Sequence, residues 1–522
     1  MKIPVSLAPV RPLALALAAV ICLTAPVALA ASDATRVIVA YKPGAQAALR
    51  AAVAAARGSV KHEIVGMDAM AVEVPTQALA GLARNPHVDY VEEDAKRYPL
   101  AATAPSTGTP YASGQLVPFG IPMVQADQLS DALAGNRKIC IIDSGYDRGH
   151  PDLPAGANIT GEYDAGTGWW YTDENHHGTH VAGTIAALNN AGTGVVGVNP
   201  NGTIKLHIVK VFGADAWAYS SSLTTAANKC KAAGAHVISM SLGGSRSVKT
   251  EQRAFDALYA GGILSVAAAG NAGTAAFSYP ASYSSVVSVA AIDESKAWAS
   301  FSQYNSQVEI AAPGVNVLST VPRGAGSAST LSVGATVYAP GGMGGSPKAS
   351  ASAPLADFGL GGAVVAGSMS GKVCLIQRGT YDFVTKISNC QASGGTGAVI
   401  YNNAAGGFGG TLGTTITAIP SVTASDTEGA AMKLQLGQTA SVAVTATSHA
   451  FYDGTSMATP HVSAVAALVW SRNLNCTAAQ LRNSLNKSAQ DLGTAGRDTK
   501  FGFGLIQAKA ADDRIRSLGC GN

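Results

Sequence analysis

The chain has 522 residues, 47% hydrophobic and 13% charged, so it is long enough for a large core and for more than one domain. Lys and Arg number 35 against 32 Asp and Glu, and no block of like charge stands out. This balance gives no sign of a nucleic-acid or anionic-membrane partner. The 59 glycines and many small polar residues are typical of a compact, loop-rich, exported protein.

The first 30 residues have the pattern of a secretion signal. Lys2 and Arg11 precede an apolar stretch over 13–23, and Ala28-Leu-Ala30 offers a small-x-small cleavage site. The stretch is too short for a membrane span, and no later segment approaches about 18 uninterrupted apolar residues. We therefore expect residues 1–30 to be removed and the rest to be secreted as a soluble protein.

Six cysteines remain after the one in the signal, Cys22, is removed. An even number of cysteines in an oxidising compartment predicts disulfides, although their spacing alone does not fix the pairing. No Cys-x-x-Cys occurs, which argues against a structural zinc site.

A small unit of different composition follows the signal, over residues 31–100. Its residue pattern predicts strands over 36–41, 69–74 and 88–92 and helices over 45–56 and 76–84. Residues 98–115, rich in Pro, Ser, Thr and Gly, are typical of a linker. From its residues alone, this module is either a permanent binding domain or a removable folding aid.

Strands and helices then take turns. The pattern predicts strands over 138–142, 205–211, 237–240, 263–267 and 286–290, and helices over 180–188, 222–233 and 250–260. Nearly all-apolar strands alternating with helices indicate an α/β fold with a parallel sheet covered on both faces. Ligand chemistry in such sheets lies at the carboxyl ends of the strands.

Three chemically matched side chains occupy such positions. Asp143 follows the first of these strands, His177 comes directly before the first helix, and Ser456 should start a later helix with Pro460 in its first turn. Singly, each has an ordinary explanation: a turn carboxylate, a buried polar group, a helix cap. Together they supply what a nucleophilic serine needs, a base and a carboxylate that orients the base.

The segments Ile141–Asp147, His177–Thr184 and Gly454–His461 resemble the three active-site motifs of the subtilisin-like serine peptidases, in that family's order. The resemblance implies that Ser456 attacks the scissile carbonyl, His177 transfers the proton and Asp143 holds the imidazolium. Residues 267–271 resemble the segment whose asparagine, here Asn271, binds the oxyanion together with the backbone N–H of Ser456.

The resemblance also implies a substrate-binding cleft for protein or peptide substrates. Its walls would be formed by Ser241, Leu242, Gly243, Gly244, Ala268, Ala269 and Gly270, with residues near Phe277. None of these is acidic, so we expect broad specificity with an apolar or aromatic residue before the cut.

Metal binding is a separate question. The group His176, His177 and His180 lacks the His-Glu-x-x-His pattern and a nearby acidic ligand, which argues against a zinc hydrolase. Catalysis by the triad needs no cofactor. The resemblance does imply a structural calcium ion, for which oxygen ligands are suited, with these ligands: Gln115, Asp152, Leu188 and Asn190.

Further segments fit the same family. Residues 31–100 resemble its propeptide, an intramolecular chaperone and inhibitor, which implies self-cleavage near Leu100 and a mature start between 101 and 114. Residues 326–448 shift to Gly, Ala, Ser and Thr and resemble a protease-associated domain. They interrupt the catalytic domain, leaving 101–325 and 449–522 as its two parts. Next to the cleft, the insert would either gate substrates or be passive.

Within this framework we expect three disulfides: Cys374–Cys390, the only cysteines of the insert; Cys476–Cys520, which would hold the C-terminal helix; and Cys140–Cys230, joining a central strand to a covering helix. The expected fold is a three-layer subtilisin-like domain with a mainly parallel sheet, a small α+β propeptide and a β-rich insert. The expected function is a secreted, monomeric serine endopeptidase made as a zymogen. The alternative is an inactive binding protein that keeps the same fold and uses the insert.

Overall fold

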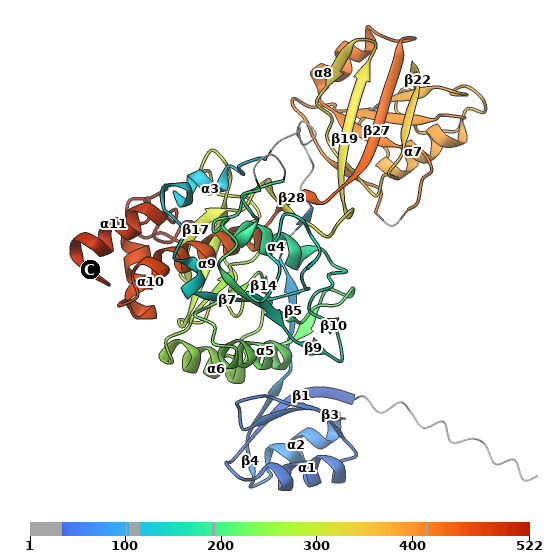
Figure 1. Cartoon of the computed structure of the whole chain (residues 1–522). Coiled ribbons are helices and arrows are strands. Elements are labelled where there is room, and N and C mark those ends of the chain that lie inside the picture. The colour runs from blue at the N-terminus through green and yellow to red at the C-terminus, as the bar shows by residue number, and fades with distance from the viewer. Residues whose placement is uncertain (1–33, 101, 104–114, 191–193, 414) are drawn as a thin grey trace, which may run out of the picture.

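The computed structural model describes residues 34–100, 102–103, 115–190, 194–413 and 415–522. They form three bodies: a small N-terminal one, a large central one and an outlying one built from 326–447 (Figure 1). The expected signal segment, 1–30, lies outside the described residues. Among the described residues, no helix is long and apolar enough to cross a membrane.

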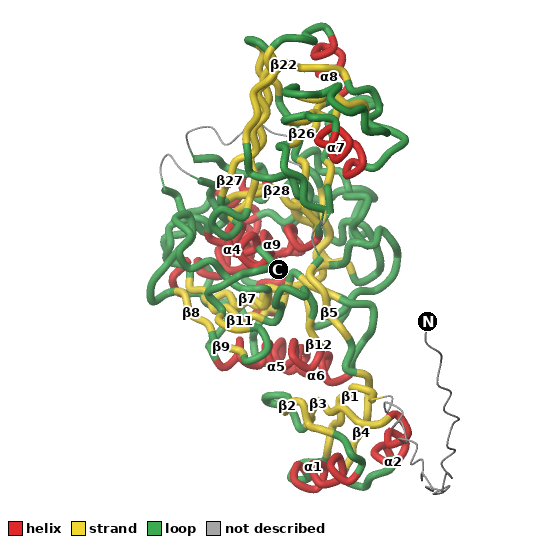
Figure 2. Tube along the Cα trace, turned by 90° about the vertical axis from the view of Figure 1, so that its right-hand side faces the viewer, coloured by secondary structure: helices red, strands yellow, loops and turns green. Residues whose placement is uncertain are grey.

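The N-terminal body is an antiparallel sheet of order β2-β3-β1-β4 with two helices on one face. Its elements are β1 (Ala34–Tyr41), α1 (Gln46–Ala55), β2 (Ser59–Glu63), β3 (Ala69–Pro75), α2 (Leu79–Ala83) and β4 (Val88–Glu93). Strand β2 was not predicted from the sequence, because its only strongly apolar residue is Val60. Both helices lie on the face turned away from the central body (Figure 2).

The N-terminal body docks on two neighbouring helices of the central body, α5 (Ser220–Ala232) and α6 (Lys249–Ala260). Neither helix is capped by the side chain of its own N-cap residue. Instead, the Glu92 carboxylate accepts the backbone N–H groups of Lys249 and Thr250 at 2.8 and 2.9 Å. The Asp94 carboxylate accepts the N–H of Ser221 at 3.0 Å. Two carboxylates thus satisfy free donors at the positive ends of two helices.

The central body contains a seven-stranded parallel sheet of order β17-β16-β15-β13-β7-β11-β8. Its strands are β7 (Lys138–Asp143), β8 (Ile159–Gly161), β11 (Lys205–Lys210), β13 (Val237–Met240), β15 (Leu264–Ala268), β16 (Val286–Ile292) and β17 (Val308–Pro313). The predicted parallel α/β sheet is therefore confirmed.

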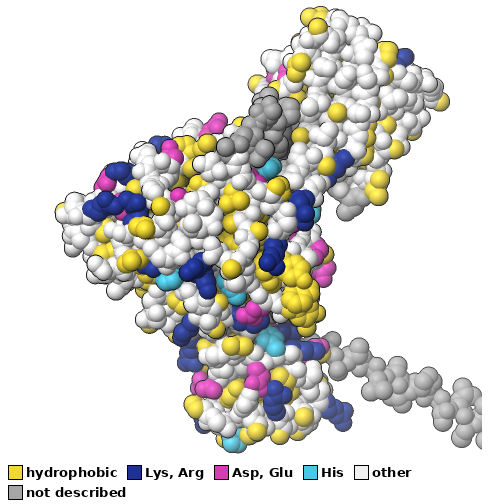
Figure 3. Space-filling view, in the orientation of Figure 1, with side chains coloured by type: hydrophobic (Ala, Val, Ile, Leu, Met, Phe, Trp, Pro, Cys, Tyr) yellow, Lys and Arg dark blue, Asp and Glu magenta, His cyan; other side chains and the backbone are white. Residues whose placement is uncertain are grey.

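Helices cover both faces of this sheet. The remaining ones are α3 (Gly120–Met123), α4 (His177–Ala186), α9 (Thr455–Arg472), α10 (Ala478–Lys487) and α11 (Ala508–Leu518). On β7, Ile139 and Ile141 pack in the core that contains α4 and α9, while Cys140 and Ile142 pack in the core under α5 and α6. Successive side chains of a strand point to opposite faces, so an uninterrupted apolar strand requires a layer on each side. On the face shown in Figure 3, acidic and basic side chains are interspersed, in keeping with the near-zero net charge.

Two of the differences between predicted and observed helix starts concern α4 and α9, the helices that carry His177 and Ser456. Helix α4 begins at His177, three residues earlier than predicted, because acceptors outside the helix satisfy its first N–H groups. Helix α9 begins at Thr455, so Pro460 lies inside the helix and not in its first turn.

The outlying body has a seven-stranded sheet of order β20-β19-β27-β22-β23-β24-β26 and two helices, α7 (Phe383–Ala392) and α8 (Asp426–Lys433). Its strands are β19 (Gly326–Val333), β20 (Thr336–Tyr338), β22 (Ser350–Asp357), β23 (Val373–Gln377), β24 (Gly397–Tyr401), β26 (Ser421–Ala424) and β27 (Thr439–Thr447). The chain leaves the central body after β18 (Val317–Thr320) and returns as β28 (His449–Asp453). These two strands pair antiparallel, so the ends of the insertion meet.

Among the described residues, three disulfides link separate parts of the chain. Cys140 of β7 pairs with Cys230 of α5, Cys374 with Cys390 inside the outlying body, and Cys476 with Cys520 beside α11. These are the same pairs as in the sequence-based prediction.

Candidate active site

Asp143 and His177 meet at the carboxyl end of the central sheet. Asp143 is the last residue of β7 and His177 the first residue of α4, and the distance from Asp143 Oδ1 to His177 Nδ1 is 2.7 Å. The backbone N–H of Ser144 donates to the same Asp143 oxygen at 2.7 Å. Both side chains are buried. With Nδ1 bonded to the carboxylate, Nε2 is the ring nitrogen left to exchange protons.

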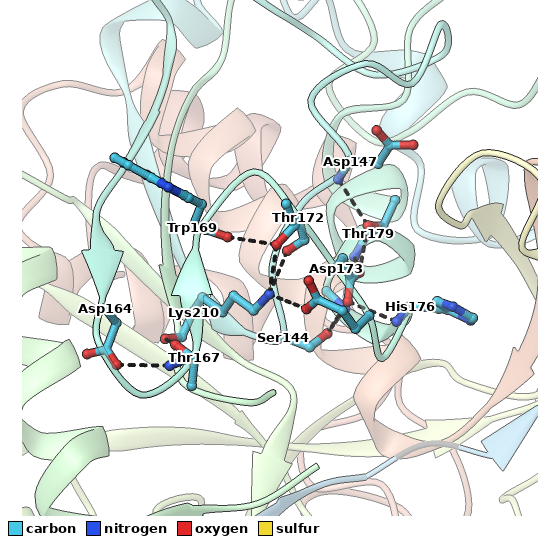
Figure 4. Close-up of polar contacts among 12 residues, drawn as sticks. Ser144, Asp147, Asp164, Thr167, Trp169, Thr172, Asp173, His176, Thr179 and Lys210 are labelled. Carbon is cyan, nitrogen blue, oxygen red and sulfur yellow. Dashed lines mark hydrogen bonds and ion pairs between the residues drawn. The ribbon is translucent and has the colours of Figure 1, made fainter. Parts of the chain in front are cut away.

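A second buried carboxylate, Asp173, holds the start of α4 in place (Figure 4). It accepts the N–H of His176 and the hydroxyl of Ser144, each at 2.8 Å, and both the N–H and the hydroxyl of Thr179. The Ser144 hydroxyl oxygen in turn accepts the N–H of Gly178 at 2.8 Å. Asp173 therefore caps the helix that carries His177. Sequence reasoning missed it, although an Asp three to six residues before the capped N–H groups is a recognisable signal.

Ser456 is the second residue of α9 and is fully buried. Its hydroxyl donates to the backbone oxygen of Ser241 at 2.8 Å and accepts the N–H of Leu100 at 3.0 Å. Its own backbone oxygen cannot bond to residue 460 of the helix, because Pro460 has no N–H. The Ser241 hydroxyl donates to this oxygen at 2.7 Å and replaces the missing bond.

Asn271 lies across the start of α9. Its side-chain oxygen accepts the backbone N–H and the hydroxyl of Thr455, at 3.0 and 2.7 Å, which fixes the amide orientation. Its Nδ2 then donates to the carbonyl oxygen of Leu100 at 2.6 Å. The N–H of Ser456 reaches the same oxygen at 3.3 Å. Two donors from different elements thus converge on one carbonyl, as in an oxyanion hole.

The segment ending at Leu100 occupies the cleft as an added strand. Strand β5 (Lys96–Pro99) pairs antiparallel with β12 (Ala218–Tyr219) on one side and with β14 (Leu242–Gly243) on the other. Beyond residue 101, β6 (Ala102–Thr103) pairs antiparallel with β28. An extended peptide that pairs with two edges is the geometry of main-chain recognition. The Leu100 carbonyl lies at the centre of this arrangement.

Two parts of the chain match known protein families. Residues 135–358 and 379–504 match the Subtilase family, and residues 35–94 match the Fervidolysin N-terminal prodomain. The chain belongs to the subtilase family. It is thus a member of a family of serine endopeptidases and carries that family's kind of N-terminal prodomain.

Relatives of this subtilase share much of the catalytic body. The chain is 39% identical over 264 residues to an alkaline protease of Alkalihalobacillus alcalophilus, and the match covers 50% of this chain and 64% of the relative. It is 42% identical over 217 residues to Subtilisin DY of Bacillus licheniformis, covering 40% of this chain and 76% of the relative. A solved structure is also similar, the crystal structure of the psychrophilic subtilisin-like protease Apa1 from the Antarctic psychrotroph Pseudoalteromonas sp. AS-11. The two sequences are 43% identical, and the superposition covers 78% of this chain and 100% of Apa1 with a TM-score of 0.61.

The expected cleft residues of this subtilase fall into two groups. Ser241, Leu242, Gly243 and Gly244 flank β5 directly. A Cβ atom on Gly243 would lie 2.9 Å from Leu100 Cδ1, and one on Gly244 would lie 2.5 Å from the backbone oxygen of Lys96. Only glycine lets the strand approach this closely.

The second group lies at the end of β15 and consists of Ala268, Ala269 and Gly270. The backbone N–H of Gly270 donates to the hydroxyl oxygen of Thr455 at 3.2 Å. A cavity of about 940 Å³ next to the strand is bordered by Leu100, Gly243, Asn271 and Phe277, among others.

His180 has a packing role in this subtilase. Its Nε2 lies 3.1 Å from the carbonyl oxygens of both Val317 and Ala450, and its ring stacks on Tyr452 at 4.3 Å. Burial, assisted by repulsion from His177, lowers the pKa of His180 to about 3. Among the described residues, no group of three or more His, Cys, Asp and Glu side chains is placed to hold a metal ion.

The four expected calcium ligands do lie together: Gln115, Asp152, Leu188 and Asn190. In this arrangement, however, their polar groups satisfy one another. Gln115 Nε2 donates to the Leu188 oxygen at 2.7 Å, and Asp152 accepts from Asn190 at 3.2 Å and from the N–H of Val195 at 2.8 Å. His449 Nε2 is 3.0 Å from Asp152 Oδ2, the oxygen that also accepts the Val195 N–H. The described residues therefore do not present the oxygen cage that calcium requires, and calcium binding stays a prediction. Residues 191–193 of this loop lie outside the description.

Proposed function

We propose that this chain is the zymogen of a secreted, monomeric serine endopeptidase whose first substrate is its own bond between Leu100 and Ala101. One observation carries the proposal: the Leu100 carbonyl oxygen accepts from Asn271 Nδ2 and the N–H of Ser456, while the preceding residues form the middle strand of three. The scissile carbonyl is thus polarised and held next to the nucleophile.

The reaction would proceed in two steps. Ser456 Oγ attacks the Leu100 carbonyl carbon and its proton passes to His177 Nε2, while Asn271 and the N–H of Ser456 stabilise the oxyanion. His177 then gives the proton to the nitrogen of Ala101, the C–N bond breaks, and an ester of Ser456 remains. Water, deprotonated by His177, then attacks the ester carbon, and His177 returns that proton to Ser456 Oγ as the ester C–O bond breaks. Asp143 keeps the imidazole oriented and stabilises its charged form.

The serine must first turn toward its base. In the structure the Ser456 hydroxyl donates to the Ser241 oxygen, and His177 Nε2 is buried without a partner among the described residues. A rotation about the Cα–Cβ bond of Ser456 would pass its hydrogen bond from the Ser241 oxygen to His177 Nε2. We propose that this rotation accompanies attack.

The N-terminal body would act first as a folding aid and then as an inhibitor. Glu92 and Asp94 supply the caps that α6 and α5 lack, and a cap of this kind contributes about 1 kcal/mol. After cleavage the same contacts would hold the released body on the enzyme, with its C-terminal strand still in the cleft. The proposed mature start, between 101 and 114, falls mainly on residues outside the description.

Substrate preference and the role of the insert extend the proposal. An apolar residue, Leu100, precedes the proposed cut, which supports a broad preference for apolar or aromatic residues at that position. We also propose that the insert is a protease-associated domain. After it, the chain returns to the central body as β28, the strand that pairs with β6 just beyond the cut. It would therefore stand beside the half of the cleft that binds the leaving segment.

Two experiments test the proposed function. An organophosphonate should label the mature enzyme once, at Ser456, and the Ser456→Ala variant should neither be labelled nor digest casein; casein digestion by that variant at the wild-type rate would refute the nucleophile. For the insert, residues 326–447 would be replaced by a short Gly-Ser turn. Slower cleavage of long substrates with unchanged cleavage of short ones would support gating, and unchanged cleavage of both would show a passive insert.

A further inference from the structure

The fourth residue before the proposed cut, Arg97, is the most deeply buried cation of the cleft strand. Its side chain is 0% exposed, whereas its neighbour Tyr98 is 46% exposed. Arg97 pairs through its backbone with Ala218 of β12 and turns its guanidinium into the catalytic body. A buried guanidinium needs a partner, because removing it from water is costly.

That partner is Glu251, in the first turn of α6. Arg97 Nη2 donates to Glu251 Oε1 at 2.9 Å and to the backbone oxygen of Arg246 at 3.0 Å. The Glu251 side chain is also 0% exposed. Burial raises the pKa of its carboxyl, against the opposing effect of Arg97. Gly244 makes room for this contact, since a Cβ there would lie 3.1 Å from Arg97 Nη1.

The two halves of the ion pair have different fates under the proposed function. Arg97 belongs to the segment that leaves, whereas Glu251 belongs to the enzyme that stays. Among the described residues, Glu251 Oε2 has no hydrogen-bond partner even with Arg97 in place, so on release the whole carboxylate would lose its cation. The emptied pocket retains a buried carboxylate and a backbone acceptor, which together fit a guanidinium.

We infer that Glu251 is a specificity-determining residue that selects an arginine at the fourth position before the cut. The inference rests on the proposed function. It adds a charged requirement to a cleft whose other named walls carry no acidic residue. The competing explanation is that the pair serves only to fold and hold the N-terminal body.

The test compares two peptide anilides on mature wild-type enzyme, acyl-Arg-Tyr-Pro-Leu and its citrulline analogue, which keeps the shape of arginine but has no charge. We expect kcat/KM to be about 10- to 100-fold higher for the arginine peptide, the range typical of a buried charged hydrogen bond. Lysine at the same position should fall between the two, because it cannot form the planar contact.

Two variants locate the effect. Glu251→Gln should bring the arginine-to-citrulline ratio close to 1, whereas Asp256→Asn, which removes an exposed carboxylate of the same helix, should leave the ratio unchanged. If the Glu251→Gln variant fails to mature, the arginine-to-citrulline ratio of the wild-type enzyme still tests whether the cleft selects arginine. A wild-type ratio near 1 with Ser456 labelled would overturn this inference alone. Failure of Ser456 to be labelled would overturn the proposed function and the inference with it.

Discussion

The hydrogen bond from Ser241 to Ser456 allows a sharp prediction about how the nucleophile is positioned. The Ser241 hydroxyl donates at 2.7 Å to a buried backbone oxygen that Pro460 leaves without its helical partner. Ser241→Ala would leave that oxygen unsatisfied, at a cost of about 1–3 kcal/mol in the free energy of unfolding. In a Pro460→Ala background, residue 460 again has an N–H, so the same Ser241→Ala substitution should cost much less.

The assay is a double-mutant cycle in the Ser456→Ala zymogen, which keeps the backbone oxygen but cannot digest itself. The free energy of unfolding is measured by denaturant titration for the parent, both single variants and the double variant. We expect a coupling energy of at least about 1 kcal/mol between positions 241 and 460. An equal cost of Ser241→Ala in both backgrounds would refute the claim that serine replaces the bond that proline removes.

Other predictions follow from the same contacts. Asn271→Leu should lower kcat/KM by about 10²–10³, because one of the two oxyanion donors is lost; unchanged kinetics would exclude this role. Asp173→Asn weakens the cap of α4 and should lower kcat/KM roughly tenfold while organophosphonate still labels Ser456, and an unaffected kcat/KM would show that the cap does not position the base. Burial lowers the pKa of His180 to about 3 and of His461 to about 4, so below about pH 6.5 the unfolded chain binds protons that the folded chain does not. The free energy of unfolding of the Ser456→Ala zymogen should therefore fall between pH 6.5 and 4, by up to about 1.4 kcal/mol per pH unit for each histidine, and denaturant titrations that show no such fall would contradict this.

Much of the catalytic body could be predicted because its signals are local. Unbroken apolar strands such as 138–142 indicate a sheet that is covered on both faces. Asp143 and His177 lie at the carboxyl end of such a sheet, where ligand chemistry is expected. Helix starts were predicted less well. The start of α4 depends on the side chains of Asp173 and Ser144, which lie outside the helix. The apolar periodicity of the helix itself carries no information about these contacts.

The contacts behind the proposed selectivity for arginine could not be predicted from the sequence. Arg97 and Glu251 are 154 positions apart, and each sits in a segment where a charged residue has an ordinary explanation, a linker edge or a helix's first turn. Likewise, Pro460 inside α9 leaves one carbonyl without its helical donor, and Ser241, from another part of the chain, supplies a donor. Such pairs become visible only when the fold brings the two segments together.

The most direct test of the central claim is the C-terminus of the N-terminal segment released during maturation. Its mass, measured in a time course of the purified zymogen, should correspond to a fragment ending at Leu100, whatever later trimming does to the new N-terminus of the enzyme. The Ser456→Ala zymogen, purified and incubated alone, should release no such fragment. A first fragment that ends elsewhere, or the same fragment from the Ser456→Ala zymogen, would contradict the account.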